Sequence, residues 1–426
     1  MKPRLRWGMI VSVGVVTLAV LAMAHGTLQA KRTVDDEALY KELELFTDAL
    51  SIVQADYVEA PEAKKLIYGA LQGMLSELDP YSQFLDPDSY NELKIDTEGK
   101  FGGLGIEITV KDDLLTVITP IDDTPAYKAG LQAGDRIVKI DGKITRGITL
   151  LEAVKKLRGK PGTTVVLTIL REKENLLKDV TVTRDIIKIQ SIREAKMLPE
   201  HLGYIRISDF RENTAEDLAA AMETLKAEQM DGLIVDLRNN PGGLLDVSVS
   251  VAELFLERQQ LIVSTKGRIR NQNLEFRSRR QGMVNSIPIV VLVNEGSASA
   301  SEILAGAIQD HRRGIILGTR THGKASVQTI FPLKDGSALR LTTSKYFTPN
   351  GRLIHEQGIA PDVVVPFEPP PKPSEKSPEA EAIFNNIDTA THDQPSPTEP
   401  MDSQLTRAVD LLKGIKVYRS SLKPAS

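Results

Sequence analysis

The sequence predicts a multi-domain α/β protein. From Leu202 onwards, short β-branched runs alternate with helical patterns, the order that builds a sheet covered by helices. Before them, residues 97–186 alternate apolar and polar positions between glycine-containing turns, which indicates a smaller, strand-rich domain. Residues 36–78 place apolar side chains three or four positions apart, as helices do. At 426 residues, the chain is long enough for two or three domains with hydrophobic cores.

The composition excludes several classes of function. Lys and Arg number 53 and Asp and Glu 57, and this net charge of −4 is too balanced for a nucleic-acid-binding protein. The chain has no cysteine, which excludes disulfides, thiol catalysis and thiolate metal sites. A chain without cysteine is compatible with any redox compartment.

Residues 1–30 form a predicted targeting segment. A head with three basic residues precedes the uncharged apolar run Gly8–Ala24, and Ala22-Met23-Ala24 offers a signal-peptide cleavage site. An uncleaved membrane anchor is the alternative, because the run has about the shortest length that spans a bilayer. In either case we expect the rest of the chain to be exported.

Residues 36–96 are expected to form an N-terminal helical region. Its apolar positions are Leu39, Leu43, Phe46 and Leu50 in a first pattern and Leu66, Leu71, Met74 and Leu75 in a second. Asp79-Pro80 ends the second pattern, and Pro87 is expected in a loop. The simplest interpretation is a helical flank that packs on the main domain.

Residues 97–186 form a separate module. Its expected elements are a strand through Ile106, Ile108 and Val110, a helix Leu150–Leu157, and strands Val165–Leu170 and Val180–Thr183. With Ala129-Gly130-Leu131 and Gly134-Asp135 between them, these elements resemble a PDZ domain.

The PDZ resemblance gives a role to the loop Gly103-Leu104-Gly105-Ile106. In such domains the backbone N–H groups of this loop bind the carboxylate of a chain terminus, and the sheet edge accepts an added strand. A plain β-turn is the alternative interpretation of the same four residues.

Residues 187–366 carry the α/β pattern. Gly203–Ile207 and Leu233–Leu237 are expected strands, Thr214 is expected to cap the helix after the first, and Leu244–Leu256 is expected to be another helix. Arg238-Asn239-Asn240-Pro241-Gly242-Gly243 joins the second strand to that helix. Pro-Gly-Gly is ordinary turn chemistry, but glycine N–H groups at a helix start also suit a developing negative charge on oxygen.

The stretch from Pro288 to Gln328 carries the expected chemistry. Pro288–Val293 is a β-branched run typical of a buried strand, and Ala300–Gln309 has a helical apolar face. Ser299 therefore lies at a strand-to-helix corner. A second apolar run, Gly314–Gly318, comes shortly before Lys324.

Ser299 has two interpretations. As an N-cap it would form a capping box with Glu302, three residues later. As a nucleophile it would use the same helix N-terminus to stabilise negative charge, so the two roles are compatible. A serine hydroxyl needs a base, and His322 and Lys324 are the candidates. A lysine desolvated among Gly, Ala and Val loses its proton near neutral pH.

The strings SASASEILAGAIQD and GKASVQ resemble the catalytic core of the carboxyl-terminal processing proteases, a family of serine–lysine peptidases. The resemblance extends over residues 38–366. It implies that Ser299 is the nucleophile, Lys324 the general base and Gln328 the glutamine that positions the lysine. Ala325 stands where many relatives have glycine, and such a small residue is expected to preserve activity.

The resemblance also implies a crotonase-like fold for the protease core. The N–H groups of Gly243, favoured over Gly242, and of Ala300 would bind the oxyanion. No metal or cofactor is implied. The implied partners are protein substrates with free, nonpolar C-termini, and the family pattern is compatible with a regulatory or adaptor protein and with a homo-oligomer joined by the N-terminal helices. The implied location is the periplasm or the extracytoplasmic face of the inner membrane.

Two further strands, Val327–Leu333 and Ala338–Tyr346, are expected to close the protease core. His355 and Glu356 make a poor metal pair, because no second histidine follows at helical spacing. His311 is expected to be solvated on the surface.

Residues 367–401 are rich in Pro, Glu, Ser and Lys and are expected to be a disordered linker. Residues 402–426 would then hold a short amphipathic helix and a tail. Its apolar positions are Leu405, Val409 and Leu412.

Two other functions compete with a protease. In the first, the PDZ domain recruits protein tails and the α/β domain is an inactive scaffold, but the complete set of Ser299, Lys324 and Gln328 argues against decay. In the second, the chain is an acyl-CoA enzyme, because crotonase-like folds host several such activities. The embedded PDZ module favours protein substrates over that alternative.

Overall fold

The computed structural model describes residues 38–111, 114–171, 174, 176–284, 286–366 and 402–421. The predicted targeting segment and the predicted linker lie outside these residues. The chain divides into two compact units, Met1–Asp79 and Pro80–Ser426. Within the described ranges, no helix combines the length and the apolar character needed to cross a membrane.

The described part of the first unit is helical, as predicted. Residues 38–56 form one helix, and α2 (Ala63–Ser76) forms a second. The second helix ends just before Asp79-Pro80, where proline restricts the preceding residue to extended conformations.

Near its start, the second unit has a helix that the sequence pattern did not predict. Pro87, predicted in a loop, is the first residue of α3 (Pro87–Glu98). Asp86 caps this helix, with its carboxylate accepting a hydrogen bond from the Ser89 N–H at 2.7 Å, and Gly99 ends it with φ +66°. Proline is well suited to a first helical position because its missing N–H has no partner there anyway. The helix lacks an apolar stripe, so periodicity did not reveal it.

A strand-rich module follows α3 and has the predicted elements. Its sheet has the order β3-β4-β5-β7-β8, with β6 paired to β5. The bounds are β3 (Ile106–Lys111), β4 (Leu114–Pro120), α4 (Pro125–Lys128), β5 (Arg136–Ile140), β6 (Lys143–Ile144), α5 (Leu150–Leu157), β7 (Thr164–Arg171) and β8 (Leu176–Thr183). β3 pairs only with β4 in this sheet, so it is an edge strand.

One two-stranded ribbon carries the chain into and out of this module. β2 (Lys100–Gly103) pairs antiparallel with β9 (Asp185–Lys188). Because β2 precedes the module and β9 follows it, both connections run side by side.

The main sheet is built from six strands in the order β10-β11-β12-β15-β16-β19. β10 is antiparallel to β11, and the remaining neighbours are parallel. The bounds are β10 (Ile192–Leu198), β11 (Leu202–Ile207), β12 (Gly232–Asp236), β15 (Ile289–Val293), β16 (Ile315–Gly318) and β19 (Val363–Val364). The predicted α/β pattern is confirmed.

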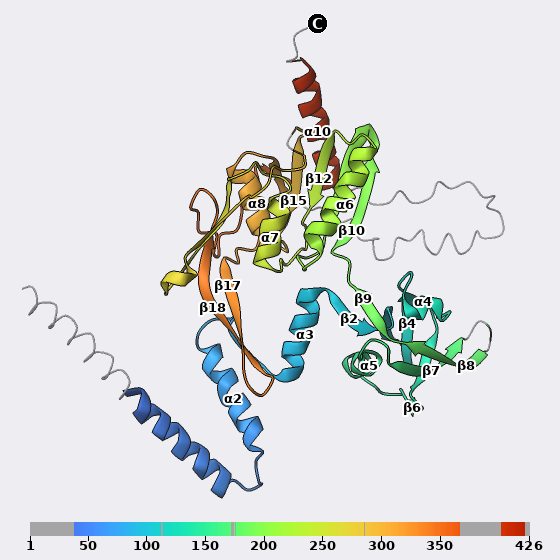
Figure 1. Ribbon diagram of the computed structural model, residues 1–426, viewed down its shortest axis with the longest axis vertical. Helices are drawn as coiled ribbons and strands as arrows, with labels where there is room; N and C mark the ends of the chain where they lie inside the picture. The colour runs from blue at the N-terminus through green and yellow to red at the C-terminus, as the bar shows by residue number, and fades with distance from the viewer. Residues whose placement is uncertain are drawn as a thin grey trace, which may run out of the picture. The chain divides into compact units, whose positions relative to one another are not determined.

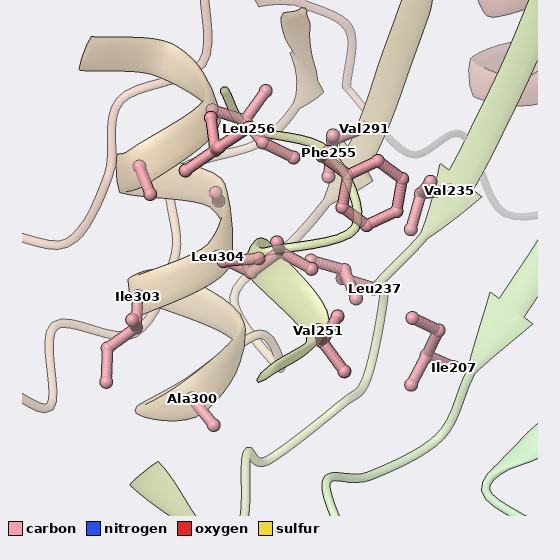
Figure 2. Close-up of a cluster of buried hydrophobic side chains, with 14 of the residues drawn as sticks. Ile207, Val235, Leu237, Val251, Phe255, Leu256, Val291, Ala300, Ile303 and Leu304 are labelled. Atoms are coloured by element: carbon pink, nitrogen blue, oxygen red, sulfur yellow. The ribbon is translucent and has the colours of Figure 1, made fainter. Parts of the chain in front are cut away.

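Helices cover both faces of this sheet (Figure 1). Leu233 and Val235 of β12 face one core with α6 (Thr214–Ala227), α7 (Leu245–Ala252) and α8 (Ala300–Asp310). Figure 2 shows part of that core, with the Phe255 ring lying between Val235 of β12 and Val291 of β15. The alternate residue Ile234 faces a second core with α10 (Ser403–Ser421). Burial on both faces explains why these strands are continuous apolar runs.

A second sheet lies against α7 and α8. Its path is β1-β18-β13-β14, and β17 also pairs with β18. The bounds are β1 (Gln83–Leu85), β13 (Leu261–Gly267), β14 (Leu274–Arg277), β17 (Ser326–Pro332) and β18 (Ala338–Phe347), with 3₁₀ turns η2 (Pro199–His201) and η3 (Arg270–Gln272) elsewhere in the unit. The predicted hairpin of β17 and β18 is confirmed.

Three local predictions were wrong. Thr214 is the first residue of α6 and Asn213 is its N-cap; the Thr214 hydroxyl instead accepts a hydrogen bond from the Arg211 N–H at 2.9 Å. The helix predicted as Leu244–Leu256 is shorter, because α7 ends at Ala252. His311 is partly buried, and its Nε2 lies 2.6 Å from the Leu261 carbonyl oxygen.

The C-terminal helix is longer than predicted and is anchored by a buried guanidinium. Arg238 binds Asp236 at the end of β12 and reaches Asp402 just before α10, with N–O distances of 2.6 and 2.7 Å. Tyr204 donates its hydroxyl to the same buried Asp236 at 2.8 Å. Ala408 and Leu412 of α10 are fully buried against the sheet. The helix is therefore part of the core.

We expect Leu412→Ala to lower the free energy of unfolding by about 2–5 kcal/mol, because it removes a buried side chain and leaves a cavity. Val417 lies on the same helix and is 69% exposed, so Val417→Ala should change the free energy of unfolding by less than about 0.5 kcal/mol. Denaturant titration of the two variants measures the difference. Equal midpoints would contradict the packing of α10 on the sheet.

Candidate active site

Three loops that carry the sequence-predicted residues leave adjacent parallel strands. β12 leads into the turn with Gly243, β15 leads into Ser299, and β16 leads into Lys324. In a parallel sheet the carboxyl ends of neighbouring strands share one edge, where ligands bind in open α/β folds. The strand order therefore brings the three loops together.

Ser299 occupies a strained corner. Its φ of +54° and ψ of −113° lie outside the regions that residues other than glycine normally adopt. Its N–H donates to Glu302 Oε2 at 2.9 Å, and the Ser299 side chain makes no capping hydrogen bond. Glu302, the N3 residue of the predicted capping box, thus holds the backbone of Ser299. The Ser299 hydroxyl is then available to other partners.

The Glu302 carboxylate joins this corner to the lysine loop. Besides Ser299, it accepts hydrogen bonds from the N–H of Lys324 at 2.9 Å, from the N–H of Gly323 at 2.7 Å and from the hydroxyl of Thr321 at 2.5 Å. Glu302 is fully buried. A buried carboxylate is tolerated where donors saturate its oxygens, as they do here.

A buried tyrosine makes a second connection between the same two segments. The Tyr346 hydroxyl donates to the carbonyl oxygen of Ser299 at 3.1 Å and also lies against the carbonyl oxygen of Lys324. Burial, with the charge of Glu302 adding to it, raises the pKa of Tyr346 well above its ordinary value. The hydroxyl therefore stays protonated and remains a donor.

The Lys324 side chain is largely shielded from water. Burial lowers the pKa of its ammonium group below the ordinary value, nearby Arg340 lowers it further, and Glu302 opposes both. A lowered pKa gives the side chain a larger neutral fraction near neutral pH, as a general base requires. His322, the rival base, is exposed, and the hydrogen bond of its backbone N–H goes to Ser297.

The Asn240–Gly243 turn packs directly on the Ser299 corner. Gly242 and Gly243 have φ of +101° and +150°, and a Cβ on Gly242 would lie 2.8 Å from Ser299 Cβ. Only glycine fits there. The Asn240 carbonyl accepts from the Ala298 N–H at 3.0 Å, so the turn and the corner form one rigid piece.

The two predicted oxyanion donors are unpaired. Gly242 donates its N–H to Asn240 Oδ1 at 2.9 Å, so that group is occupied. In the part of the chain that the structure describes, the N–H groups of Gly243 and Ala300 have no hydrogen-bond partner. This difference favours Gly243 over Gly242 as a donor to a bound ligand.

One cavity of about 630 Å³ lies at this corner. Its polar lining includes Ser299, Lys324, Gly243 and Gln328. Apolar side chains complete the wall, among them Leu93, Leu245, Ile303, Val327 and Ile330. Charged side chains, among them Lys94, Asp96, Arg211 and Glu212, also line the cavity. A cleft in which polar groups converge beside an apolar wall is typical of a substrate site.

Gln328 lies in the cavity wall but does not hydrogen-bond Lys324. Its amide nitrogen donates to Ser326 Oγ at 2.9 Å and lies 3.3 Å from Thr342 Oγ1. The structure thus brings Ser299, Lys324, Gly243 and Ala300 together and places Gln328 beside them.

The predicted tail-binding loop lies in the strand-rich module, away from the cavity lining. Gly105 has φ +77°, and its carbonyl accepts from the Ile121 N–H at 2.9 Å. The N–H groups of Leu104 and Gly105 have no partner within the described ranges. They lie just before the edge strand β3, which begins at Ile106.

Three residues of the site were not singled out from the sequence. Glu302 was seen only as a helix cap, although a charge within the apolar face of α8 was a usable signal. Tyr346 was the end of an expected strand. Tyr81, whose ring lies beside the Lys324 ammonium at 4.6 Å from ring centroid to Nζ, carried no signal.

Known proteins resemble the chain over most of its length. The profile of peptidase family S41 matches residues 201–365, a PDZ profile matches residues 102–182, and the profile named activating protease CtpB N-terminal domain matches residues 13–89. The carboxy-terminal-processing protease of Bartonella bacilliformis is 46% identical over 79% of this chain and 78% of its own length. The chain belongs to the carboxyl-terminal processing protease family.

This family membership confirms the serine-type peptidase and the PDZ domain. The carboxyl-terminal-processing protease of Picosynechococcus sp. is 38% identical over 75% of this chain and 78% of that protein. Among solved structures, the photosystem II D1 C-terminal processing protease is 32% identical, with a TM-score of 0.43, and covers 76% of this chain and 92% of that one.

We expect Glu302→Gln to damage this protease, because an amide NH₂ would face N–H donors in a buried site. The free energy of unfolding should fall by about 2–3 kcal/mol, and peptidase activity by about tenfold or more. Glu295 is exposed on the same loop, so Glu295→Gln is the matched control. Denaturant titration and casein degradation measure the two effects; parental activity in Glu302→Gln would contradict the role of this carboxylate.

Proposed function

We propose that this carboxyl-terminal processing protease is an exported endopeptidase that cleaves substrates near their C-terminus with a Ser299–Lys324 dyad. The observation that carries the proposal is the single cavity lined by the Ser299 corner, the desolvated Lys324 and the unpaired N–H of Gly243. Export rests on the basic and apolar pattern of residues 1–30.

In the proposed reaction, neutral Lys324 Nζ takes the proton from Ser299 Oγ as that oxygen bonds to the substrate carbonyl carbon. The carbonyl π electrons move to oxygen, and the N–H groups of Gly243 and Ala300 stabilise the resulting oxyanion. The C–N bond then breaks, and the leaving amine takes the proton from Lys324. Water, deprotonated by Lys324, then attacks the ester carbonyl carbon. The C–Oγ bond breaks, Lys324 returns the proton to Ser299 Oγ, and the acid is released.

Gln328 is proposed to orient Lys324 when a substrate fills the cavity. Its amide is held by Ser326 and Thr342, next to the lysine loop. No metal or cofactor takes part in the proposed cycle, because each proton transfer uses Lys324.

The PDZ domain is proposed to bind the free carboxylate of the substrate. The unpaired N–H groups of Leu104 and Gly105 and the free edge of β3 suit a carboxylate and an added strand. Helix α5 of this domain bonds to α3 through Lys155–Asp88 at 2.8 Å and Arg158–Glu92 at 3.0 Å. Since α3 also lines the cavity, the proposed tail site and the cavity share a neighbour. Protein substrates with nonpolar tails, a regulatory protein and a homo-oligomer are the proposed partners.

We expect Ser299→Ala and Lys324→Ala each to abolish proteolysis of casein while the fold is retained. Because nucleophile and base act as a unit, the double variant should be scarcely worse than either single one. Lys334 lies exposed in a turn, so Lys334→Ala is a matched lysine control. Turnover by Ser299→Ala within tenfold of the parent would contradict the assignment of Ser299 as the nucleophile.

We expect a substrate with an amidated or Asp-ending tail to be cleaved far more slowly than the same substrate ending in Ala or Val. Amidation removes the charge that the loop N–H groups bind. Competition between matched free-acid and amide peptides measures the preference. Equal cleavage rates would mean that the PDZ domain braces the protease and does not select the tail.

A further inference from the structure

An aromatic ring lies against the proposed catalytic base. The Lys324 Nζ is 4.6 Å from the centroid of the Tyr81 ring. Tyr81 comes from the segment before β1, outside residues 201–365 that match the peptidase profile. The proposed base thus contacts a residue that lies well before the peptidase region in the sequence.

The backbone around Tyr81 is fixed to the same strand that supports the site. Arg340 Nε of β18 donates to the Tyr81 carbonyl at 3.1 Å, and the Ser82 hydroxyl accepts from the Thr342 N–H at 3.1 Å. β1 continues this attachment by pairing antiparallel with β18. Tyr346, which contacts both Ser299 and Lys324, belongs to that strand as well. The attachment of the Tyr81 backbone to β18 therefore determines the position of the ring.

The ring discriminates between the two protonation states of the lysine. An aromatic face attracts an ammonium ion through its quadrupole and has little attraction for a neutral amine. The other groups that act on Lys324 are Glu302 of α8, which favours the charged form, and Arg340 of β18, which disfavours it. Tyr346 is a neutral donor at the lysine carbonyl. Tyr81 thus favours the charged form of Lys324, as Glu302 does, whereas burial disfavours it.

We propose that Tyr81 is a positioning residue for Lys324, holding the protonated side chain on its ring and releasing it towards Ser299 when the proton is lost. The proposal rests on the proposed role of Lys324 as base. In the described structure Lys324 Nζ lies 4.6 Å from the centroid of the ring, the position that favours the charged form of the lysine. Deprotonation, with the proton passing to solvent, removes the attraction and leaves an amine that accepts the serine proton.

Tyr81→Leu and Tyr81→Phe test the ring itself. Leucine keeps the apolar cover but has no π face, whereas phenylalanine keeps the face and loses only the hydroxyl. The rise of kcat/KM with pH reports the pKa of the free base. We expect Tyr81→Leu to shift that rise to lower pH by about half to one and a half units, and Tyr81→Phe to leave it near the parent. A shift of equal size in both variants, or none in Tyr81→Leu, would overturn the proposal.

A direct titration separates this proposal from the proposed function. In the inactive Ser299→Ala protein, the lysine side chain signals can be followed by NMR against pH, with Lys324 assigned by its loss in Lys324→Ala. Tyr81→Leu in that background should lower the Lys324 pKa by the same amount, and an unchanged value would refute the ring contact. If Lys324→Ala instead remains an active protease, the proposed function fails whatever the titration shows. Should Tyr81→Leu not fold, Tyr81→Met supplies the same loss of the ring.

Discussion

The arrangement of the proposed catalytic residues depends on one buried carboxylate. Glu302 accepts hydrogen bonds from the backbones of Ser299, Gly323 and Lys324, which lie on loops after two different strands. These bonds fix the strained corner and the lysine loop to each other through their backbones, independently of the Ser299 and Lys324 side chains. Backbone strain of this kind persists only where surrounding contacts determine it completely. The sheet supplies the rest, because β12, β15 and β16 are parallel neighbours and present their loops at one edge.

Periodicity predicted most of the fold. Leu233 and Val235 were recognisable as a buried strand because residues on both faces are apolar, and the helix Leu150–Leu157 was found with the bounds of α5. α3 was not predicted because it lies at the surface and lacks an apolar stripe. Its only sequence signals were the Asp86 cap and Pro87 at the first helical position.

The site was predictable where residues stand close together in sequence. Ser299 and Lys324 follow strands that a pattern reveals, and Gly243 follows a turn whose glycines are required by φ and by packing. Tyr81 and Tyr346 are brought to Lys324 through strand pairing between distant segments, which no local pattern records. The hydrogen bonds of the turn could not be predicted from the sequence either. Which of Gly242 and Gly243 has an unpaired N–H depends on the orientation of the Asn240 amide.

The chain enters and leaves the PDZ domain through one ribbon, in which β2 pairs with β9. The orientation of the domain therefore depends on this ribbon and on the contacts between the domain and α3. Its further contacts with α3 include the ion pairs Lys155–Asp88 and Arg158–Glu92, whose side chains are partly exposed, so salt weakens them. We therefore expect higher ionic strength to weaken the attachment of the PDZ domain to α3, while the buried hydrogen bonds of the protease core are little affected.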